Sequence, residues 1–204
     1  MKKHAIVTMT LAIALAMPAI TSAGPMSDFA TEASEKEYTF RGIPWGASVD
    51  EIENSDFLIE YPDYEYDKDL NKIFVYNVEV AGKSASAVLS IDDGGLSGAM
   101  YLMEENHDNL IDYYHDYLDL EKSLVKKYGR PDNKIDNWED DFYKNDPSLY
   151  DFAVGAGDVT FIRTWNGDNS SISLMCSGGD LKINNIIFYS SDSFKFSEHK
   201  DDGL

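Results

Sequence analysis

Six short segments with strand character, in two groups of three, constrain the fold of this 204-residue chain most strongly. They are residues 72–80, 84–91 and 96–103, followed by 159–165, 170–176 and 181–189. Glycine-containing turns of three or four residues separate the segments within each group. The strongest hairpin signal is Asn166-Gly167, because both residues tolerate the positive φ of a tight turn. Consecutive hairpins predict antiparallel pairing, either in one sheet of about six strands or in two three-stranded halves.

A helix signal precedes each group of strands. Ser48-Val49-Asp50-Glu51 is a capping box, so we expect a short helix from residue 49 to about 54. A longer helix is expected over residues 107–128, with Gly129 and Pro131 ending it. Its apolar stripe consists of Leu110, Tyr114, Tyr117, Leu118, Leu124, Val125 and Tyr128. The element order predicts an α+β fold of two successive helix-plus-three-stranded-meander units, with the helices on one face of an antiparallel sheet.

The first 23 residues have the organisation of a bacterial secretory signal peptide. Lys2 and Lys3 form a basic start, an apolar stretch follows, and Thr21-Ser22-Ala23 places small residues at a cleavage site. The apolar stretch of about 16 residues is shorter than the ~20 that span a bilayer, so we expect cleavage and no stable membrane anchor afterwards. The cleaved protein is then secreted, either extracellular or periplasmic.

The composition of the remaining chain divides it into three further parts. We expect a flexible linker at 24–37 and a single α+β domain at 38–190, with two similar halves, 38–104 and 105–190, as the alternative. A polar tail follows at 191–204.

The excess of acidic residues limits the kinds of partner. Without its first 23 residues the chain carries 15 Lys and Arg against 37 Asp and Glu, a net charge of −22. Such a chain repels phosphate, so no nucleic acid is expected as a partner. A cationic protein or peptide surface is favoured, bound in a salt-sensitive way.

Recognisable catalytic motifs are missing from the sequence. It contains no nucleophile elbow, no H-E-x-x-H pair and no EF-hand loop. The single cysteine, Cys176, excludes an internal disulfide and alternates with Ile172 and Leu174, which predicts burial. We therefore favour a non-enzymatic binding module. A deep pocket joining His107 or His115 to carboxylates would instead indicate an enzyme.

An alternative function, an exported metal-dependent hydrolase, depends on Asp108, Asp112, His115 and Asp119. Their spacing of four, three and four residues places all of them on one face of the expected helix. Carboxylates and imidazole are ligands for calcium, manganese or zinc. The same spacing also describes a solvated face opposite the apolar stripe. No other cofactor is expected, except calcium held loosely by the acidic loops 63–69 and 136–141.

Four aromatic residues form a candidate binding set for a carbohydrate or peptide. Tyr61, Tyr64 and Tyr66 interleave with acidic residues in an expected loop, 60–67, and Trp138 lies in a second expected loop, 130–157. Tyrosine combines apolar area with a hydroxyl at low entropy cost, which suits recognition. The alternative is that the tyrosine rings fold back over the core.

Two segments carry a resemblance to known proteins. Phe40-Arg41-Gly42-Ile43-Pro44-Trp45-Gly46-Ala47-Ser48 resembles the F-x-G-I-P-W-G-x-S opening of uncharacterised small exported bacterial proteins. Those proteins also have a later helix ending in K-Y-G-x-P, here Lys127-Tyr128-Gly129-Arg130-Pro131. The architecture is also similar to that of BamE-like and beta-lactamase-inhibitor-like proteins, although the lipid-bearing Cys of the BamE-like pattern is missing. This architectural resemblance implies binding rather than catalysis.

The opening segment also has a physical interpretation of its own. Pro44 has a fixed φ and forces Ile43 into an extended conformation. We expect Ile43 and Trp45 to anchor the corner between the first extended segment and the first helix against the sheet.

Overall fold

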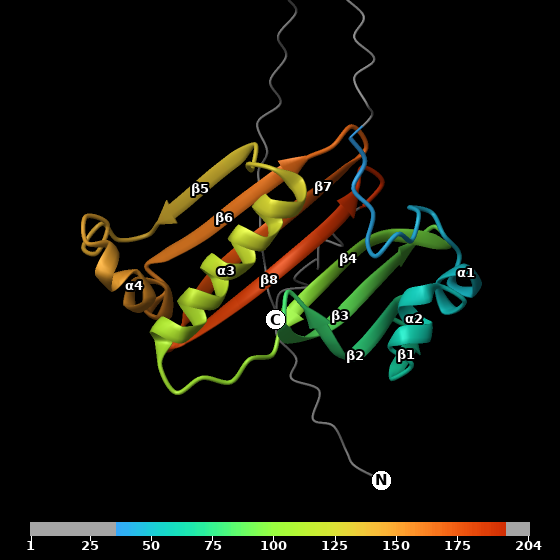
Figure 1. Ribbon diagram of the computed structural model, residues 1–204, viewed down its shortest axis with the longest axis horizontal. Helices are drawn as coiled ribbons and strands as arrows, with labels where there is room; N and C mark the ends of the chain where they lie inside the picture. The colour runs from blue at the N-terminus through green and yellow to red at the C-terminus, as the bar shows by residue number, and fades with distance from the viewer. Residues whose placement is uncertain (1–35, 195–204) are drawn as a thin grey trace, which may run out of the picture. The chain divides into compact units, whose positions relative to one another are not determined.

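Residues 36–194, the part of the chain described by the computed structural model, contain one antiparallel sheet of eight strands with helices packed on one face (Figure 1). The predicted signal peptide at 1–23, nearly all of the predicted linker and the tail beyond residue 194 lie outside these described residues. Within residues 36–194, no helix has the length and apolar character needed to span a membrane.

The N-terminal half contributes four strands to the sheet. Two short helices, α1 (Val49–Glu53) and α2 (Asp56–Glu60), precede β1 (Tyr64–Asp67), β2 (Lys72–Val80), β3 (Lys83–Asp92) and β4 (Gly95–Met103). The predicted capping box is confirmed. The Ser48 amide donates to Glu51 Oε2 over 2.8 Å, and the Glu51 amide donates to Ser48 Oγ over 3.3 Å. The expected loop 60–67 is wrong in its second half, because residues 64–67 pair with β2 as an edge strand.

The C-terminal half contributes the other four strands. It consists of α3 (Leu110–Tyr128), β5 (Asn133–Trp138), a 3-10 turn η1 (Pro147–Leu149), α4 (Tyr150–Ala156), β6 (Val159–Asn166), β7 (Ser170–Gly179) and β8 (Lys182–Ser191). The long helix starts at Leu110 rather than at residue 107. It ends where predicted, at Gly129, whose φ of 85° is in the left-handed region and whose amide donates to the Val125 carbonyl.

The predicted pattern of two units, each with one helix and three strands, does not match the structure. All six predicted strands are present, but each half has an additional edge strand and an additional helix. In the second half, β5 and α4 occupy the expected loop 130–157. The two halves share one sheet because β4 pairs with β8, with Met100 opposite Phe188. The strand order is β1-β2-β3-β4-β8-β7-β6-β5.

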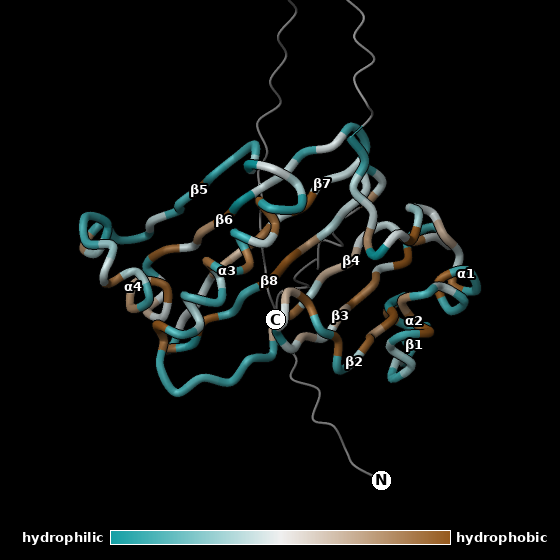
Figure 2. Tube along the Cα trace, viewed as in Figure 1, coloured by the Kyte–Doolittle hydropathy of each residue, from teal (hydrophilic) through white to brown (hydrophobic). Residues whose placement is uncertain are grey.

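The core lies between the sheet and the helices. Residues of β2, β3, β4, β6, β7 and β8 point into it, and Cys176 is buried there as predicted. The α3 stripe differs from the prediction in two residues, since Leu118 is 41% exposed while Leu120 is fully buried. Figure 2 shows hydrophobic residues concentrated in the central strands, whereas β5 and the loop after it are hydrophilic.

The opening segment folds as a corner against the sheet, as predicted. Ile43 is buried, and the Trp45 indole donates to the Tyr38 carbonyl over 2.7 Å. The Ile43 amide donates to the Phe40 carbonyl, which closes a tight turn with Arg41 and Gly42 at its centre. Both central residues have positive φ, 52° for Arg41 and 77° for Gly42. This geometry places the Arg41 side chain over the end of the sheet, where the candidate site begins.

Candidate functional site

The four predicted metal-ligating residues do not converge. Asp108 precedes α3, so the expectation that all four share one helix face is wrong for that residue. Asp112 accepts a hydrogen bond from the Asn109 side chain over 3.3 Å, and Asp119 lies 3.8 Å from Lys83 Nζ. His115 is exposed. Within residues 36–194, no three His, Cys, Asp or Glu side chains are grouped as metal ligands would be.

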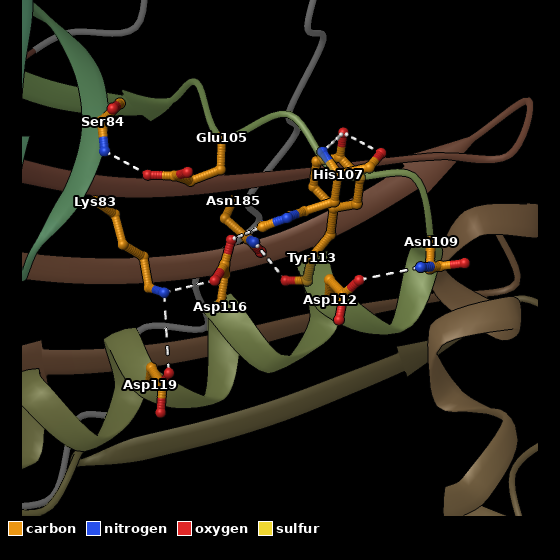
Figure 3. Close-up of polar contacts among 10 residues, drawn as sticks. All are labelled: Lys83, Ser84, Glu105, His107, Asn109, Asp112, Tyr113, Asp116, Asp119 and Asn185. Carbon is orange, nitrogen blue, oxygen red and sulfur yellow. Dashed lines mark hydrogen bonds and ion pairs between the residues drawn. The ribbon is translucent and has the colours of Figure 1, made fainter.

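A different carboxylate, Asp116, is the centre of the polar network on α3 (Figure 3). Its Oδ1 lies 2.5 Å from Nζ of Lys83, the first residue of β3. Its Oδ2 lies 2.6 Å from Nε2 of His107, in the loop between β4 and α3. The Asp116 side chain is only 10% exposed, because it lies on the sheet-facing side of the helix. One carboxylate therefore binds basic side chains from two separate elements.

Two polar side chains complete this network. The Tyr113 hydroxyl accepts the His107 amide proton over 2.9 Å. Asn185 of β8 donates to the Tyr113 carbonyl over 2.8 Å, and its Oδ1 is buried without a partner. The contacts connect β3, β8 and the start of α3, so the network fixes the position of the helix on the sheet.

A deep pocket that joins a histidine to carboxylates would indicate an enzyme, and the network meets only part of this condition. His107 does contact a carboxylate, but neither of the two main cavities of the structure is lined by His107 or Asp116. Its hydrogen-bond partners among the described residues are Asp116 and Tyr113, and no serine, threonine or cysteine is bonded to it. The arrangement therefore holds elements together and lacks a nucleophile next to the imidazole.

The four aromatic candidates divide between opposite edges of the sheet. Tyr64 and Tyr66 belong to the edge strand β1, whereas Trp138 ends the edge strand β5. Seven strand spacings separate these edges, roughly 30 Å. Tyr61 packs against Phe57 with ring centroids 5.5 Å apart. All four rings are partly buried against the core, so they do not form a common patch.

The side chains around β1 nevertheless form a distinct surface, which we call the acidic edge. It comprises the nine carboxylates of residues 50–69, namely Asp50, Glu51, Glu53, Asp56, Glu60, Asp63, Glu65, Asp67 and Asp69. Among the described residues, no basic nitrogen lies within 4 Å of any of them. Lys68 is the only basic residue in this stretch.

Some of these carboxylates have local structural roles. Asp63 Oδ2 accepts from the Asn77 side chain, and Asp67 Oδ1 accepts the amide protons of Asp69 and Leu70. The capping hydrogen bonds from Ser48 hold the pKa of Glu51 below its usual value. Hydrogen bonding to the charged form of a carboxylate has this effect. Glu51 is therefore ionised at neutral pH.

Two cavities lie on either side of the turn that contains Arg41. One, of about 440 Å³, separates the turn from α1 and α2. Its lining includes Arg41, Glu51, Asp56 and the apolar side chains of Ile43 and Pro44. The other, of about 310 Å³, lies between α3 and the sheet. Tyr101, Tyr189 and Lys127 are among its lining residues. The larger cavity is formed within residues 41–56, whereas the smaller one joins elements far apart in the chain, which the sequence alone does not bring together.

Cys176 is not a functional candidate. Burial raises the pKa of its thiol well above the usual range, so the nucleophilic thiolate is not formed at neutral pH. Comparison of this chain with protein-family models, with curated proteins and with solved structures found no match.

Proposed function

We propose that the protein is an exported, non-enzymatic binding module that takes a cationic protein or peptide at the acidic edge. The observation that carries the proposal is the run of nine carboxylates at residues 50–69 without a basic partner among the described residues. Export, as expected from the N-terminal signal, would place this surface outside the cytoplasm.

The charge distribution explains why a partner would bind here. Like charges that lack counter-charges repel one another, and a cationic surface relieves that repulsion on binding. Elsewhere, Glu121 and Asp136 are engaged with Lys134 and Arg163, so their charge is compensated within the chain. The acidic edge forms no such ion pair among the described residues, apart from a longer-range interaction of Glu60 with Arg41, and is the stronger attractor for a cation.

The cavity of about 440 Å³ adds a specific recognition element at this edge. Glu51 and Asp56 supply carboxylates for the charged end of a Lys or Arg side chain, and they outnumber the one cation of the lining, Arg41. Ile43 and Pro44 supply apolar surface for its methylene stem, which long basic side chains bury readily. The same stretch exposes Ile59 and Leu70, at 68% and 57%. We therefore expect a partner that is both cationic and amphipathic.

The alternative proposal, a metal-dependent hydrolase, has less support. It requires Asp112, His115 and Asp119 to face a common point, whereas Asp119 lies next to Lys83 and Asp112 next to Asn109. Thermal melting with calcium, manganese and zinc tests it directly, because an ion that binds only the folded state raises the melting temperature. A rise that disappears in His115→Ala would favour this alternative.

The test of the binding proposal compares three immobilised proteins as bait in culture medium at about 0.05 M and about 0.5 M NaCl. The baits are the wild type, the variant D56N/E60Q/E65Q, and the control D108N/D180N/D192N. Both variants lose the same charge, and all six residues are exposed carboxylates without an ion pair among the described residues.

We expect the wild type and the control to retain the same cationic protein or peptide at low salt and to release it at high salt. The acidic-edge variant should retain little of it. Equal retention by both variants would show that net charge alone, rather than this edge, attracts the ligand. Retention that does not change with salt would contradict the electrostatic basis of the proposal.

A further inference from the structure

We propose that the cavity between α3 and the turn joining β2 to β3 binds a small organic carboxylate, an acid group on an apolar body. This site adjoins the acidic edge, because Arg41 lines both cavities, but it takes a ligand of the opposite charge. Its volume of about 310 Å³ is at the lower end of the range for ligand pockets, which points to a small molecule.

Arg41 supplies the first cationic group. Its Nε donates to Tyr101 Oη over 2.6 Å, and its Nη2 donates to the Glu79 carbonyl over 2.7 Å. Its guanidinium carbon lies 5.5 to 5.7 Å from the ring centroids of Phe57, Tyr61 and Tyr101. The guanidinium is thus held in place by neutral groups, and its remaining N–H groups have no acceptor among the described residues.

The absence of a carboxylate partner distinguishes Arg41 from the other arginine packed among core aromatics. Arg163 lies 2.7 Å from Asp136 and 3.4 Å from Glu121, so its charge is compensated. Arg41 has no ion pair within residues 36–194, in a chain where acidic residues outnumber basic ones by more than two to one. A fixed guanidinium with free donors is suited to bidentate recognition of a carboxylate.

Lys127 supplies the second cationic group. It lies in the last turn of α3 and lines the same cavity, with its Nζ 4.8 Å from the centroid of the Tyr128 ring. Like Arg41, it forms no ion pair within the described part of the chain. Two cations without an ion pair among the described residues therefore border one hollow, with Glu79 in the same lining and Glu60 acting on Arg41 only at longer range.

Tyrosine hydroxyls add neutral hydrogen-bond donors. Burial raises the pKa of Tyr101 to about 12, even though the neighbouring Arg41 charge lowers it, so the hydroxyl keeps its proton at neutral pH. Tyr101 Oη accepts from Arg41, and its own proton has no acceptor among the described residues. Burial also raises the pKa of Tyr189, which lines the cavity and lies 3.3 Å from the Tyr128 hydroxyl. These hydroxyls add no negative charge that would repel an anion.

The rest of the cavity wall is mixed. Val80, Leu120, Leu124 and Ile187 supply apolar surface, while Glu79 and Ser123 are polar. The two cations outnumber the one carboxylate of the lining, and with the aliphatic side chains they match a carboxylate on a hydrocarbon body better than an inorganic anion, which would gain nothing from the apolar surface.

The backbone at Arg41 is a further argument. A φ of 52° is unfavourable for arginine by roughly 1–2 kcal/mol relative to glycine. Asparagine or glycine would fit this turn position better. In this conformation the Arg41 side chain reaches Tyr101 and Glu79, where glycine or asparagine would make neither contact.

The experiment measures binding of 3-phenylpropionate and of its neutral amide by thermal melting and by NMR titration of the full secreted chain. At ten times its Kd, the acid should raise the melting temperature by about 3–6 °C. The amide should have no such effect. R41Q and K127Q should each weaken acid binding about ten-fold, the loss expected for one charge-assisted contact.

Matched controls keep the proposal falsifiable. K126Q removes the neighbouring exposed charge from the same helix turn and should bind as the wild type does. D56N/E60Q/E65Q should also bind normally, which separates this site from the acidic edge. If R41Q does not fold, the comparison of K127Q with K126Q decides. Equal binding of acid and amide, or equal binding by K127Q and K126Q, would overturn the proposal.

A peptide with a free C-terminus presents the same chemistry on a larger body. Acetyl-Ala-Phe and its C-terminal amide, titrated in the same way, test whether the carboxylate comes from a peptide C-terminus. Tighter binding of 3-phenylpropionate than of acetyl-Ala-Phe supports a small-acid site, and the reverse order would contradict it.

Discussion

His107 Nε2 lies 2.6 Å from Asp116 Oδ2, which ties the loop between β4 and α3 to the sheet-facing side of α3. The other oxygen of Asp116 lies 2.5 Å from Lys83 Nζ. Because Asp116 and Lys83 are 10% and 16% exposed, neither partner is well solvated by water if the other is lost. The network is thus a structural clamp whose strength can be measured.

Asp116→Asn should lower the free energy of unfolding by about 2 kcal/mol. The amide keeps the shape of the side chain but leaves the Lys83 charge without its main partner in a poorly hydrated position. Urea unfolding of the two proteins measures the difference. Asp119→Asn is the matched control, because Asp119 is 66% exposed and lies 3.8 Å from the same Lys83. It should cost less than about 0.5 kcal/mol. Equal losses in both variants would contradict the clamp.

Gly178 should not tolerate a side chain. A Cβ at this position would lie 2.2 Å from the Val154 carbonyl oxygen, so α4 would have to move away from β7. Gly178→Ala should therefore destabilise the fold by about 3 kcal/mol, a decrease of roughly 6–12 °C in melting temperature.

The neighbouring Gly179 provides the control for this substitution. A Cβ there meets no atom within 4 Å, so Gly179→Ala should leave the melting temperature nearly unchanged. A Gly178→Ala protein as stable as the Gly179→Ala protein would mean that α4 does not pack closely on the end of β7.

Stability should decrease in alkaline solution as buried tyrosines ionise. Burial raises the pKa of Tyr101 from 10.0 to about 12 in the folded state. Its contribution is therefore complete below pH 10 and is lost as the pH rises from 10 towards 12. The free energy of unfolding of the wild type should fall between pH 8 and about pH 11. In Tyr101→Phe this fall should be about 1 kcal/mol smaller. Urea midpoints at the two pH values measure this, and parallel losses in both proteins would argue against a buried, protonated Tyr101.

Local signals predicted much of the fold. The capping box at Ser48 and the helix end at Gly129 rest on contacts within four residues, and the bounds of β2 match the prediction. β5 and α4 were missed for physical reasons. β5 is almost wholly exposed, so its sequence has no alternating apolar pattern that would reveal a strand. Backbone pairing with β6 stabilises it instead. α4 has only seven residues with Gly155 among them, so its stability comes from packing rather than propensity.

The sites were harder to predict than the fold. Asp116 lies next to Tyr117 and three residues after Tyr113, at the border of the apolar stripe. An acidic residue at such a border position was the one sequence signal that a buried ion pair could form here. Its partner Lys83 is 33 residues away, and nothing in the sequence connects them. The cavity at Arg41 likewise joins the opening turn to α3 and β8, which only the tertiary structure brings together.

The most direct test of the proposed function is the Kd of the captured cationic partner, measured by calorimetry against NaCl concentration for three proteins. For the wild type and for D108N/D180N/D192N, the account predicts the same affinity and the same steep weakening with salt. For D56N/E60Q/E65Q, it predicts at least about ten-fold weaker binding at low salt and a shallower salt dependence. Identical curves for all three proteins would contradict it.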